Sequence, residues 1–351
     1  MNGAKKKVAV QLCAMARRLA FAQATFSVAA FVACSSTPPD EWIDAASHRV
    51  TMIGVAPRVQ LEVLDWGGIH PPMVFLAGLG DTGHAFDKFA ARFQDAFRPI
   101  AITRRGFGAS SRPDSGYDSA TRSRDILLVL DSLHIARAVL VGHSIAGEEL
   151  SHFAVAYRDR VIALVYLEAY SYGTDAPADF PPFPAQAEPP PMTRADSGSV
   201  QSVLAYWPRR FEYEPVEADV RAVCQFGPTG RLELLPAPNA ASRVYDGTSR
   251  SEYARVSAPA LAIYAPHVSL QDQFPGAKDF DEPNRVAALR YLQAQQKYEA
   301  RQISRFRAEM RGGVVFTMPG ATHYLHYHRA DAVERTIRTF LRGLSVGASA
   351  N

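Results

Sequence analysis

One short segment, residues 142–147, limits the folds open to this chain more than any other. Its sequence is Gly-His-Ser-Ile-Ala-Gly, and the apolar run 138–141 before it is typical of a buried strand. Small residues stand two positions before and two after Ser144, as expected in a strained turn with little room for side chains. We therefore expect a strand, a sharp turn with Ser144 at its tip, and then a helix whose N-terminus presents the Ile145 N–H.

Short apolar runs alternate with helical stretches along most of the chain. The apolar runs are residues 73–76, 99–102, 138–141, 162–167, 259–264 and 314–317. The helical stretches are residues 85–96, 124–133, 146–157, 282–311 and 331–341. Alternating polarity within residues 48–66 predicts an antiparallel hairpin at one sheet edge. This order predicts an α/β fold, with a mostly parallel central sheet and helices on both faces.

The alternation breaks between residues 172 and 256, where the sequence becomes rich in proline and carries only broken helical patterns. An insertion between strands, above their carboxyl ends, lies where it covers a binding site. We therefore predict a cap over 172–256 between two core segments, 49–171 and 257–345, with a tail at 346–351.

The N-terminal region has the pattern of an export signal. Residues 1–33 carry five cations and no acid, and 19–33 are uncharged. The residues that end in Cys34 are similar to a bacterial lipoprotein cleavage box. This predicts a signal peptide over 1–33, a tether over 34–48, and an exported protein that is periplasmic or membrane-anchored through lipidated Cys34. A helix at the N-terminus of a cytoplasmic protein is the alternative.

Composition narrows the class of protein further. The chain is 47% apolar with a net charge of +3, and its first 33 residues hold so many cations that the rest has 33 basic against 35 acidic residues. No basic face for nucleic acid is implied. Three cysteines do not make a disulfide framework, and Cys224 is expected to be a buried thiol.

A second polar segment is expected to lie near the turn that carries Ser144. Residues 320–323, Gly-Ala-Thr-His, follow the last predicted strand and precede the last predicted helix. Loops at the carboxyl ends of parallel strands meet at one sheet edge. A serine hydroxyl is a poor nucleophile at neutral pH, and it needs a histidine base that a carboxylate orients. His323 is the candidate base.

Four segments together carry a family resemblance. In chain order they are residues 77–80 (Ala-Gly-Leu-Gly), 105–110 (Arg-Gly-Phe-Gly-Ala-Ser), 142–147 and 320–323. With them, residues 49–343 resemble the α/β-hydrolase superfamily. The resemblance implies that Ser144 is the nucleophile and His323 the general base, with the backbone N–H groups of Leu79 and Ile145 as the oxyanion hole.

The triad acid departs from the pattern of most relatives, which place an aspartate shortly after the strand that corresponds to 259–264. Here no carboxylate appears until Asp272. Glu168 ends the preceding predicted strand, 24 residues after Ser144, where some superfamily members place the acid. A carboxylate at the end of a buried strand is costly without a partner, and His323 would supply one. We therefore favour Glu168 over Asp272 as the triad acid. The alternative is a purely structural Glu168 that pairs with an arginine or caps a helix.

The resemblance predicts a serine hydrolase that cleaves a small carboxylic ester through an acyl-enzyme, with a small-molecule substrate and neither cofactor nor metal. Lactonase, thioesterase and C–C hydrolase chemistry use the same triad, and a ligand-binding or sensor lipoprotein on a hydrolase scaffold is the alternative from another class.

Several polar residues near the motifs are expected to play supporting roles. His326 and His328 are assigned to the surface or to the rim of a pocket, because no acid or cysteine accompanies them at metal-ligand spacing. Glu148 and Glu149 are expected to be solvated or paired with arginines. Arg104 and its neighbour Arg105 are expected to brace loops.

Overall fold

The computed structural model describes residues 42–171, 179–211, 213–234 and 238–348. The predicted signal peptide, Cys34 and most of the tether lie outside the described residues, as do the first residues of the predicted cap. Within these described ranges, no helix is both long and apolar enough to cross a membrane.

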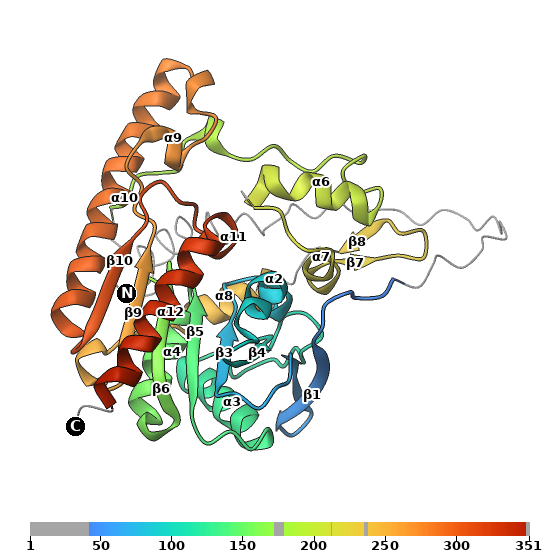
Figure 1. Cartoon of the computed structure of the whole chain (residues 1–351). Helices are drawn as coiled ribbons and strands as arrows, with labels where there is room; N and C mark the ends of the chain where they lie inside the picture. Colours follow the sequence, from blue (N-terminus) through green and yellow to red (C-terminus); the bar gives the residue numbers. More distant parts are fainter. Residues whose placement is uncertain (1–41, 172–178, 212, 235–237, 349–351) are drawn as a thin grey trace.

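An eight-stranded sheet forms the centre of the protein, in the order β1-β2-β4-β3-β5-β6-β9-β10 (Figure 1). The strands are β1 Arg49–Ala56, β2 Val59–Asp65, β3 Pro72–Leu76, β4 Arg98–Ile102, β5 Ala138–His143, β6 Val161–Leu167, β9 Ala260–Tyr264 and β10 Gly313–Thr317. β2 pairs antiparallel with both β1 and β4, and the strands from β4 to β10 are parallel. The predicted α/β fold and edge hairpin are confirmed.

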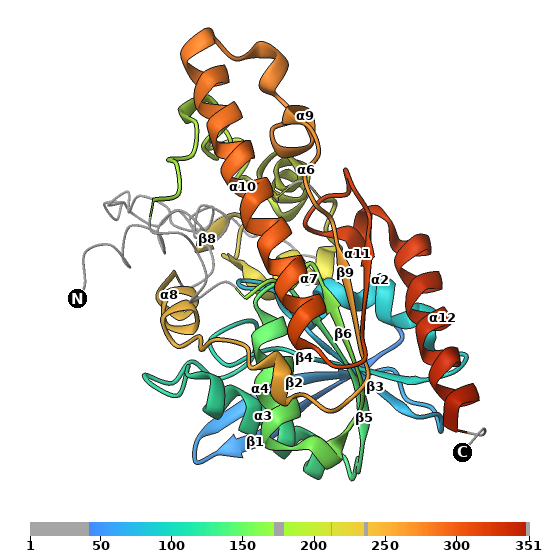
Figure 2. The same ribbon diagram turned by 90° about the vertical axis from the view of Figure 1, so that its left-hand side faces the viewer.

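Helices cover both faces of the sheet and enclose two separate cores (Figure 2). Side chains of α3 (Ser119–Ser132), α4 (Ala146–Ala156) and α10 (Glu282–Glu309) pack on one face. Those of α2 (Asp87–Ala90) and α12 (Ala330–Ala348) pack on the other.

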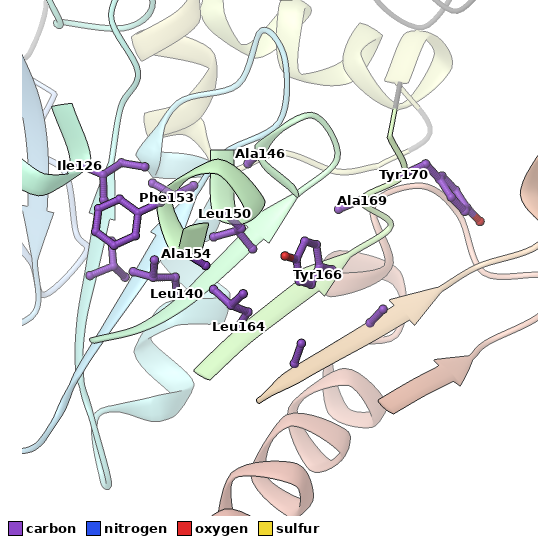
Figure 3. Packing of buried hydrophobic residues seen from close by; sticks show 14 of the residues in the cluster. Ile126, Leu140, Ala146, Leu150, Phe153, Ala154, Leu164, Tyr166, Ala169 and Tyr170 are labelled. Atoms are coloured by element: carbon purple, nitrogen blue, oxygen red, sulfur yellow. The ribbon is translucent and has the colours of Figure 1, made fainter. Parts of the chain in front are cut away.

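The packing behind β5 and β6 fixes the position of α4 (Figure 3). Leu150 and Phe153 of α4 lie in one buried cluster with Leu140 of β5 and with Leu164 and Tyr166 of β6. Complete burial of such a side chain stabilises the fold by about 1.5–3 kcal/mol. Because α4 begins directly after the turn at the end of β5, this packing also holds the turn in place.

The helix predicted over 85–96 is replaced by three short elements: the 3₁₀ turn η1 (Gly83–Phe86), α2, and the 3₁₀ turn η2 (Ala91–Phe93). Phe86, Phe89 and Phe93 all pack on Phe75 of β3, with ring centroids 5.1–6.3 Å apart. The i, i+3, i+7 spacing of these residues keeps the three rings on one face toward β3, although the segment is divided into short turns.

The described residues of the predicted cap form three α-helices and a small two-stranded ribbon. These are α6 (Val200–Phe211), α7 (Glu217–Val223), β7 (Gln225–Phe226), β8 (Leu232–Leu234) and α8 (Pro238–Asp246). Val203, Trp207 and Tyr213 form a small core with Val220 and Cys224, so the expected buried thiol is confirmed. Figure 1 places α6, α7 and the ribbon above the core, on the side of α2. Short 3₁₀ turns also lie at Arg158–Arg160, Ala185–Ala187, Tyr253–Arg255 and Ala277–Asp279.

Candidate active site

Ser144 lies in a sharp turn between β5 and α4. Its φ is +56°, in the left-handed region that non-glycine residues rarely adopt. Its backbone N–H donates to the carbonyl of Leu167 at 2.9 Å, which ties the turn to the end of β6. A Cβ on Gly147 would lie 2.6 Å from the Ala169 Cβ, so only glycine lets α4 approach β6 this closely.

Glu168 directly follows β6 and has the same backbone conformation, with φ +47°. Its Oε1 accepts the N–H of Ala265 at 2.7 Å, and its Oε2 lies 3.3 Å from His323 Nδ1. The side chain is deeply buried, and burial raises the pKa of the Glu168 carboxyl to about 7 although the Ala265 N–H favours the ionised form. The carboxylate is therefore placed to orient the His323 ring.

His323 lies in the loop between β10 and the short helix α11 (Leu325–His328), and this loop packs against the turn that carries Ser144. His143, the residue before Ser144, has its Nε2 3.0 Å from the His323 carbonyl oxygen, and the two rings are 4.7 Å apart. Burial, and then the neighbouring His323, lowers the pKa of His143 well below its usual value. Because a carbonyl only accepts, the neutral His143 ring carries its proton on Nε2.

Asp272, the alternative acid, has a different local role. Its carboxylate accepts the N–H of Ser269 at 2.9 Å and so completes a capping box at the start of α9 (Leu270–Gln273). The residue lies beside the histidine loop, since a Cβ on Gly320 would be 3.6 Å from Asp272 Oδ1. The geometry thus favours Glu168 as the partner of His323.

The loop after β3, which carries Leu79, packs on the same turn. The side chains of Leu79 and Ile145 belong to one apolar cluster, together with Val244 of α8. A Cβ on Gly78 would lie 2.8 Å from His143 Nδ1, so the loop backbone approaches the turn more closely than a larger residue would allow. The structure therefore brings the two expected oxyanion donors into one region.

A buried ion-pair network ties the loop after β3 to α4. Arg104 donates to the carbonyls of Ala77 and Gly78, at 2.8 and 3.1 Å, and its Nε lies 2.5 Å from Glu149 Oε1. Arg122 contacts Glu149 and Glu148 at 2.6 and 2.7 Å. Of the two expectations for these glutamates, pairing with arginines is confirmed, and bracing of a loop by Arg104 is confirmed as well.

Comparison with known proteins identifies the family of this chain. Residues 73–336 match the family model described as the alpha/beta hydrolase family. The chain belongs to this family. It is 25% identical over 305 residues to 2-(acetamidomethylene)succinate hydrolase of Mesorhizobium japonicum, which covers 85% of this chain and 97% of the relative.

One further relative and one solved structure are informative. This chain is 33% identical over 147 residues to the 2-hydroxy-6-oxononadienedioate/2-hydroxy-6-oxononatrienedioate hydrolase of Burkholderia vietnamiensis, which covers 40% of this chain and 50% of that one. The crystal structure of E-2-(acetamidomethylene)succinate hydrolase matches with a TM-score of 0.58 at 22% identity, over 84% of this chain and 99% of the other. That likeness supports the fold.

The position expected for His326 in this hydrolase is wrong. Its side chain is buried, with its ring 5.0 Å from Phe86 and 4.8 Å from His143, whereas His328 is exposed as expected. Burial, and then the nearby His143 and His323, lowers the pKa of His326 well below its usual value. A neutral imidazole packs much as an aromatic ring does, and the short helix α11 turns it inward. Sequence spacing alone gives no signal for this.

Two buried acids beside the site were not singled out from the sequence. Asp81 Oδ2 lies 3.9 Å from His143 Nδ1, and Asp219 of α7 accepts hydrogen bonds from Thr82 at 3.0 Å and Tyr213 at 3.2 Å. Burial and then repulsion by Asp219 raise the pKa of Asp81 well above its usual value. Burial raises the pKa of Asp219 to about 6. The only sequence signal was the position of Asp81, two residues after Leu79.

Proposed function

We propose that this hydrolase cleaves a small carboxylic ester through an acyl-enzyme formed on Ser144. The observation that carries the proposal is the 3.3 Å contact between His323 Nδ1 and Glu168 Oε2 in a loop that packs against the turn of Ser144. A carboxylate on Nδ1 leaves Nε2 unprotonated, which is the tautomer that accepts a proton from a serine.

The proposed reaction has two steps. His323 Nε2 takes the Ser144 proton as Oγ attacks the ester carbonyl, and the N–H groups of Leu79 and Ile145 stabilise the oxyanion. Each such donor contributes about 3 kcal/mol at the transition state. The imidazolium then protonates the leaving alcohol. Water, deprotonated by the same ring, attacks the acyl-enzyme and releases the carboxylic acid.

The charges beside the site favour a neutral substrate. The names of the two relatives above describe dicarboxylates, which carry two negative charges at neutral pH. In this chain burial raises the pKa of both the Asp81 and the Asp219 carboxyls, and Asp219 raises that of Asp81 further, so additional negative charge nearby would be unfavourable. This supports a neutral ester over a dicarboxylate.

Lactonase, thioesterase and C–C hydrolase activities use the same triad and are the alternatives within the class of serine hydrolases. Rates measured on a panel of esters, lactones, thioesters and C–C substrates distinguish them. A ligand-binding or sensor lipoprotein remains the alternative from another class. We also propose export with a lipid on Cys34, on the grounds of the N-terminal sequence alone. Mass spectrometry of the mature N-terminus tests this, and an intact, unmodified residue 1–34 segment would refute it.

Fluorophosphonate labelling combined with Ser144→Ala tests the enzymatic proposal. The wild-type protein should be labelled at Ser144 and should hydrolyse p-nitrophenyl acetate. The variant should lose both, with a nearly unchanged melting temperature, because it removes one hydroxyl of a half-buried residue from a turn that backbone hydrogen bonds hold. Turnover that survives in Ser144→Ala removes the mechanism. An unreactive Ser144 in protein that still binds a ligand favours the sensor.

A further inference from the structure

Four side chains converge away from the proposed triad and have no part in its mechanism. Asp44 and His48 come from the segment before β1, and His84 and Asp87 come from η1 and α2. Each offers one nitrogen or oxygen atom, and these four atoms lie within 4.8 Å of one another. We call these four residues the His-Asp cluster. Two imidazoles and two carboxylates are a donor set that suits a divalent transition-metal ion.

Four contacts within the His-Asp cluster are close in length to the edges of a tetrahedron around a zinc ion. His48 Nε2 lies 3.4 Å from Asp44 Oδ2 and 3.2 Å from Asp87 Oδ1. His84 Nδ1 lies 3.6 Å from Asp44 Oδ2 and 3.1 Å from Asp87 Oδ2. A tetrahedral zinc ion with ligands about 2.0–2.1 Å away holds those ligand atoms about 3.3 Å apart. The four contacts lie on both sides of that value, with the two contacts to Asp87 made by its two different oxygens. With one donor atom from each residue the four atoms spread over up to 4.8 Å, so the side chains would draw in slightly around an ion.

His84 Nδ1 and Asp87 Oδ2 share a hydrogen bond, but several other polar atoms of the cluster are buried without one. The His48 side chain is only 1% exposed, and neither of its ring nitrogens has a hydrogen-bond partner among the described residues. Asp44 Oδ2 and Asp87 Oδ1, the two oxygens closest to His48 Nε2, lack one as well. Buried polar atoms without partners are costly and uncommon. One ion between His48 Nε2 and these two oxygens would satisfy all three atoms at once.

A further carboxylate is placed to orient one of the histidines. Glu62 of β2 faces the other ring nitrogen of His84, with 3.9 Å between Nε2 and Oε1, and its Oε2 accepts the hydroxyl of Thr103 at 2.7 Å. Metal-bound histidines commonly direct their second N–H to a carboxylate in this way. Two ionised aspartates also cancel the charge of a divalent ion.

We propose that the His-Asp cluster binds Zn²⁺ as a structural ion, which fastens the segment before β1 to the turn and helix after β3. The same turn follows the loop that carries Leu79, so the ion would also brace that loop from its far end. This site does not depend on the proposed esterase mechanism, and its test uses binding and stability instead of turnover.

Titration of the full-length protein with zinc alone tests the proposal. After chelator treatment and buffer exchange, calorimetry with ZnCl₂ should show one tight site per chain. The melting temperature should rise by about 5 °C once free zinc exceeds its dissociation constant a hundredfold. Mg²⁺ and Ca²⁺, which prefer oxygen ligands, should not compete. Lack of stoichiometric zinc binding overturns the proposal.

His48→Gln should weaken zinc binding at least about 100-fold and remove the thermal shift, because it deletes a ligand. His267→Gln is the matched control, since His267 also contacts a buried carboxylate, Glu299, at 2.6 Å but lies outside the cluster. It should bind zinc as the wild type does. Unchanged zinc affinity in His48→Gln overturns the assignment.

Crystals of the wild-type protein soaked in zinc keep the test decisive if His48→Gln folds poorly. An anomalous difference peak between the four side chains supports the proposal. Peaks elsewhere alone would identify adventitious binding and overturn it.

Discussion

Ser144 and Glu168 follow neighbouring strands, β5 and β6, and both have left-handed backbones, with φ of +56° and +47°. Such conformations cost of order 1–3 kcal/mol each in a non-glycine residue. The surrounding contacts hold them, through the Leu167 carbonyl for Ser144 and the Ala265 N–H for Glu168. Strained residues held in place by specific backbone contacts are typical of functional sites.

Glu168→Gln should reduce kcat/KM for p-nitrophenyl acetate by roughly 10⁴-fold, because the amide would stabilise the wrong tautomer of His323. Asp272→Asn should cost much less, since an asparagine oxygen at this position can still accept the N–H of Ser269 in the capping box. Steady-state kinetics of the two purified variants make the comparison. A larger loss in Asp272→Asn would transfer the role of acid to that residue.

The pH profile follows from the burial of Glu168, whose pKa is about 7 in the fold against an ordinary 4.5. The raised pKa means that the carboxylate forms only as pH rises through about 7. Activity should therefore fall about tenfold per unit below that value, and the inflection belongs to the Glu168–His323 pair as a whole. A kcat/KM profile that stays flat between about pH 5.5 and 8 would contradict the assignment.

At the scale of elements, the loop after β3 depends on Arg104, which donates to the carbonyls of Ala77 and Gly78 and pairs with Glu149. Lysine keeps the charge but loses the planar fork that makes these contacts together. Arg104→Lys should lower kcat more than it raises KM, because the two carbonyls that Arg104 holds directly precede Leu79, whose N–H is a proposed oxyanion donor. We treat Arg104 as a positioning residue.

Arg105→Lys is the matched control, since Arg105 forms a buried two-point contact with Asp125 at 2.6 and 2.7 Å but does not bond the loop carbonyls. Both variants should be destabilised by comparable amounts, since each replaces a buried two-point contact between a guanidinium and a carboxylate by a single ammonium group. Urea unfolding and kinetics separate the two effects. An equal loss of kcat in both variants would show that Arg104 acts through stability alone.

The strands and the turn at Ser144 were predictable because they rest on local patterns: apolar runs buried on both faces, and small residues around one serine. The contact of Glu168 with His323 joins segments 155 residues apart, so the sequence supplied the candidates and the fold decides between them. The inward turn of His326 and the convergence of His48 with His84 arise from tertiary packing. Only the short spacings Asp44 to His48 and His84 to Asp87 hinted at the cluster.

On the scale of the whole molecule, the predicted cap is joined to the core through buried polar contacts. Asp219 of α7 accepts a hydrogen bond from Thr82, which follows the loop after β3, and another from Tyr213. Tyr213 in turn stacks on Tyr324 of the histidine loop, with ring centroids 4.0 Å apart. The predicted cap therefore meets the loops that carry Leu79 and His323 through Asp219 and Tyr213, so the charge state of Asp219 bears on this junction.

Asp219 makes the stability of this junction depend on pH, and its sign is opposite to that of an ordinary paired carboxylate. Burial raises its pKa from 3.8 to about 6, so the folded protein binds the proton more tightly than the unfolded chain does. Stability is therefore lost as pH rises from about 4 to 6, by about 3 kcal/mol for this shift.

Asp219→Asn removes that dependence. The free energy of unfolding of the variant, relative to that of the wild type, should therefore rise by about that amount from pH 4 to pH 8. Tyr213→Phe should show the reverse trend, because it removes a donor that favours the ionised carboxylate, at a cost of about 1 kcal/mol at pH 8. Urea unfolding at both pH values measures the two trends, and parallel shifts in the two variants would contradict this account of the junction.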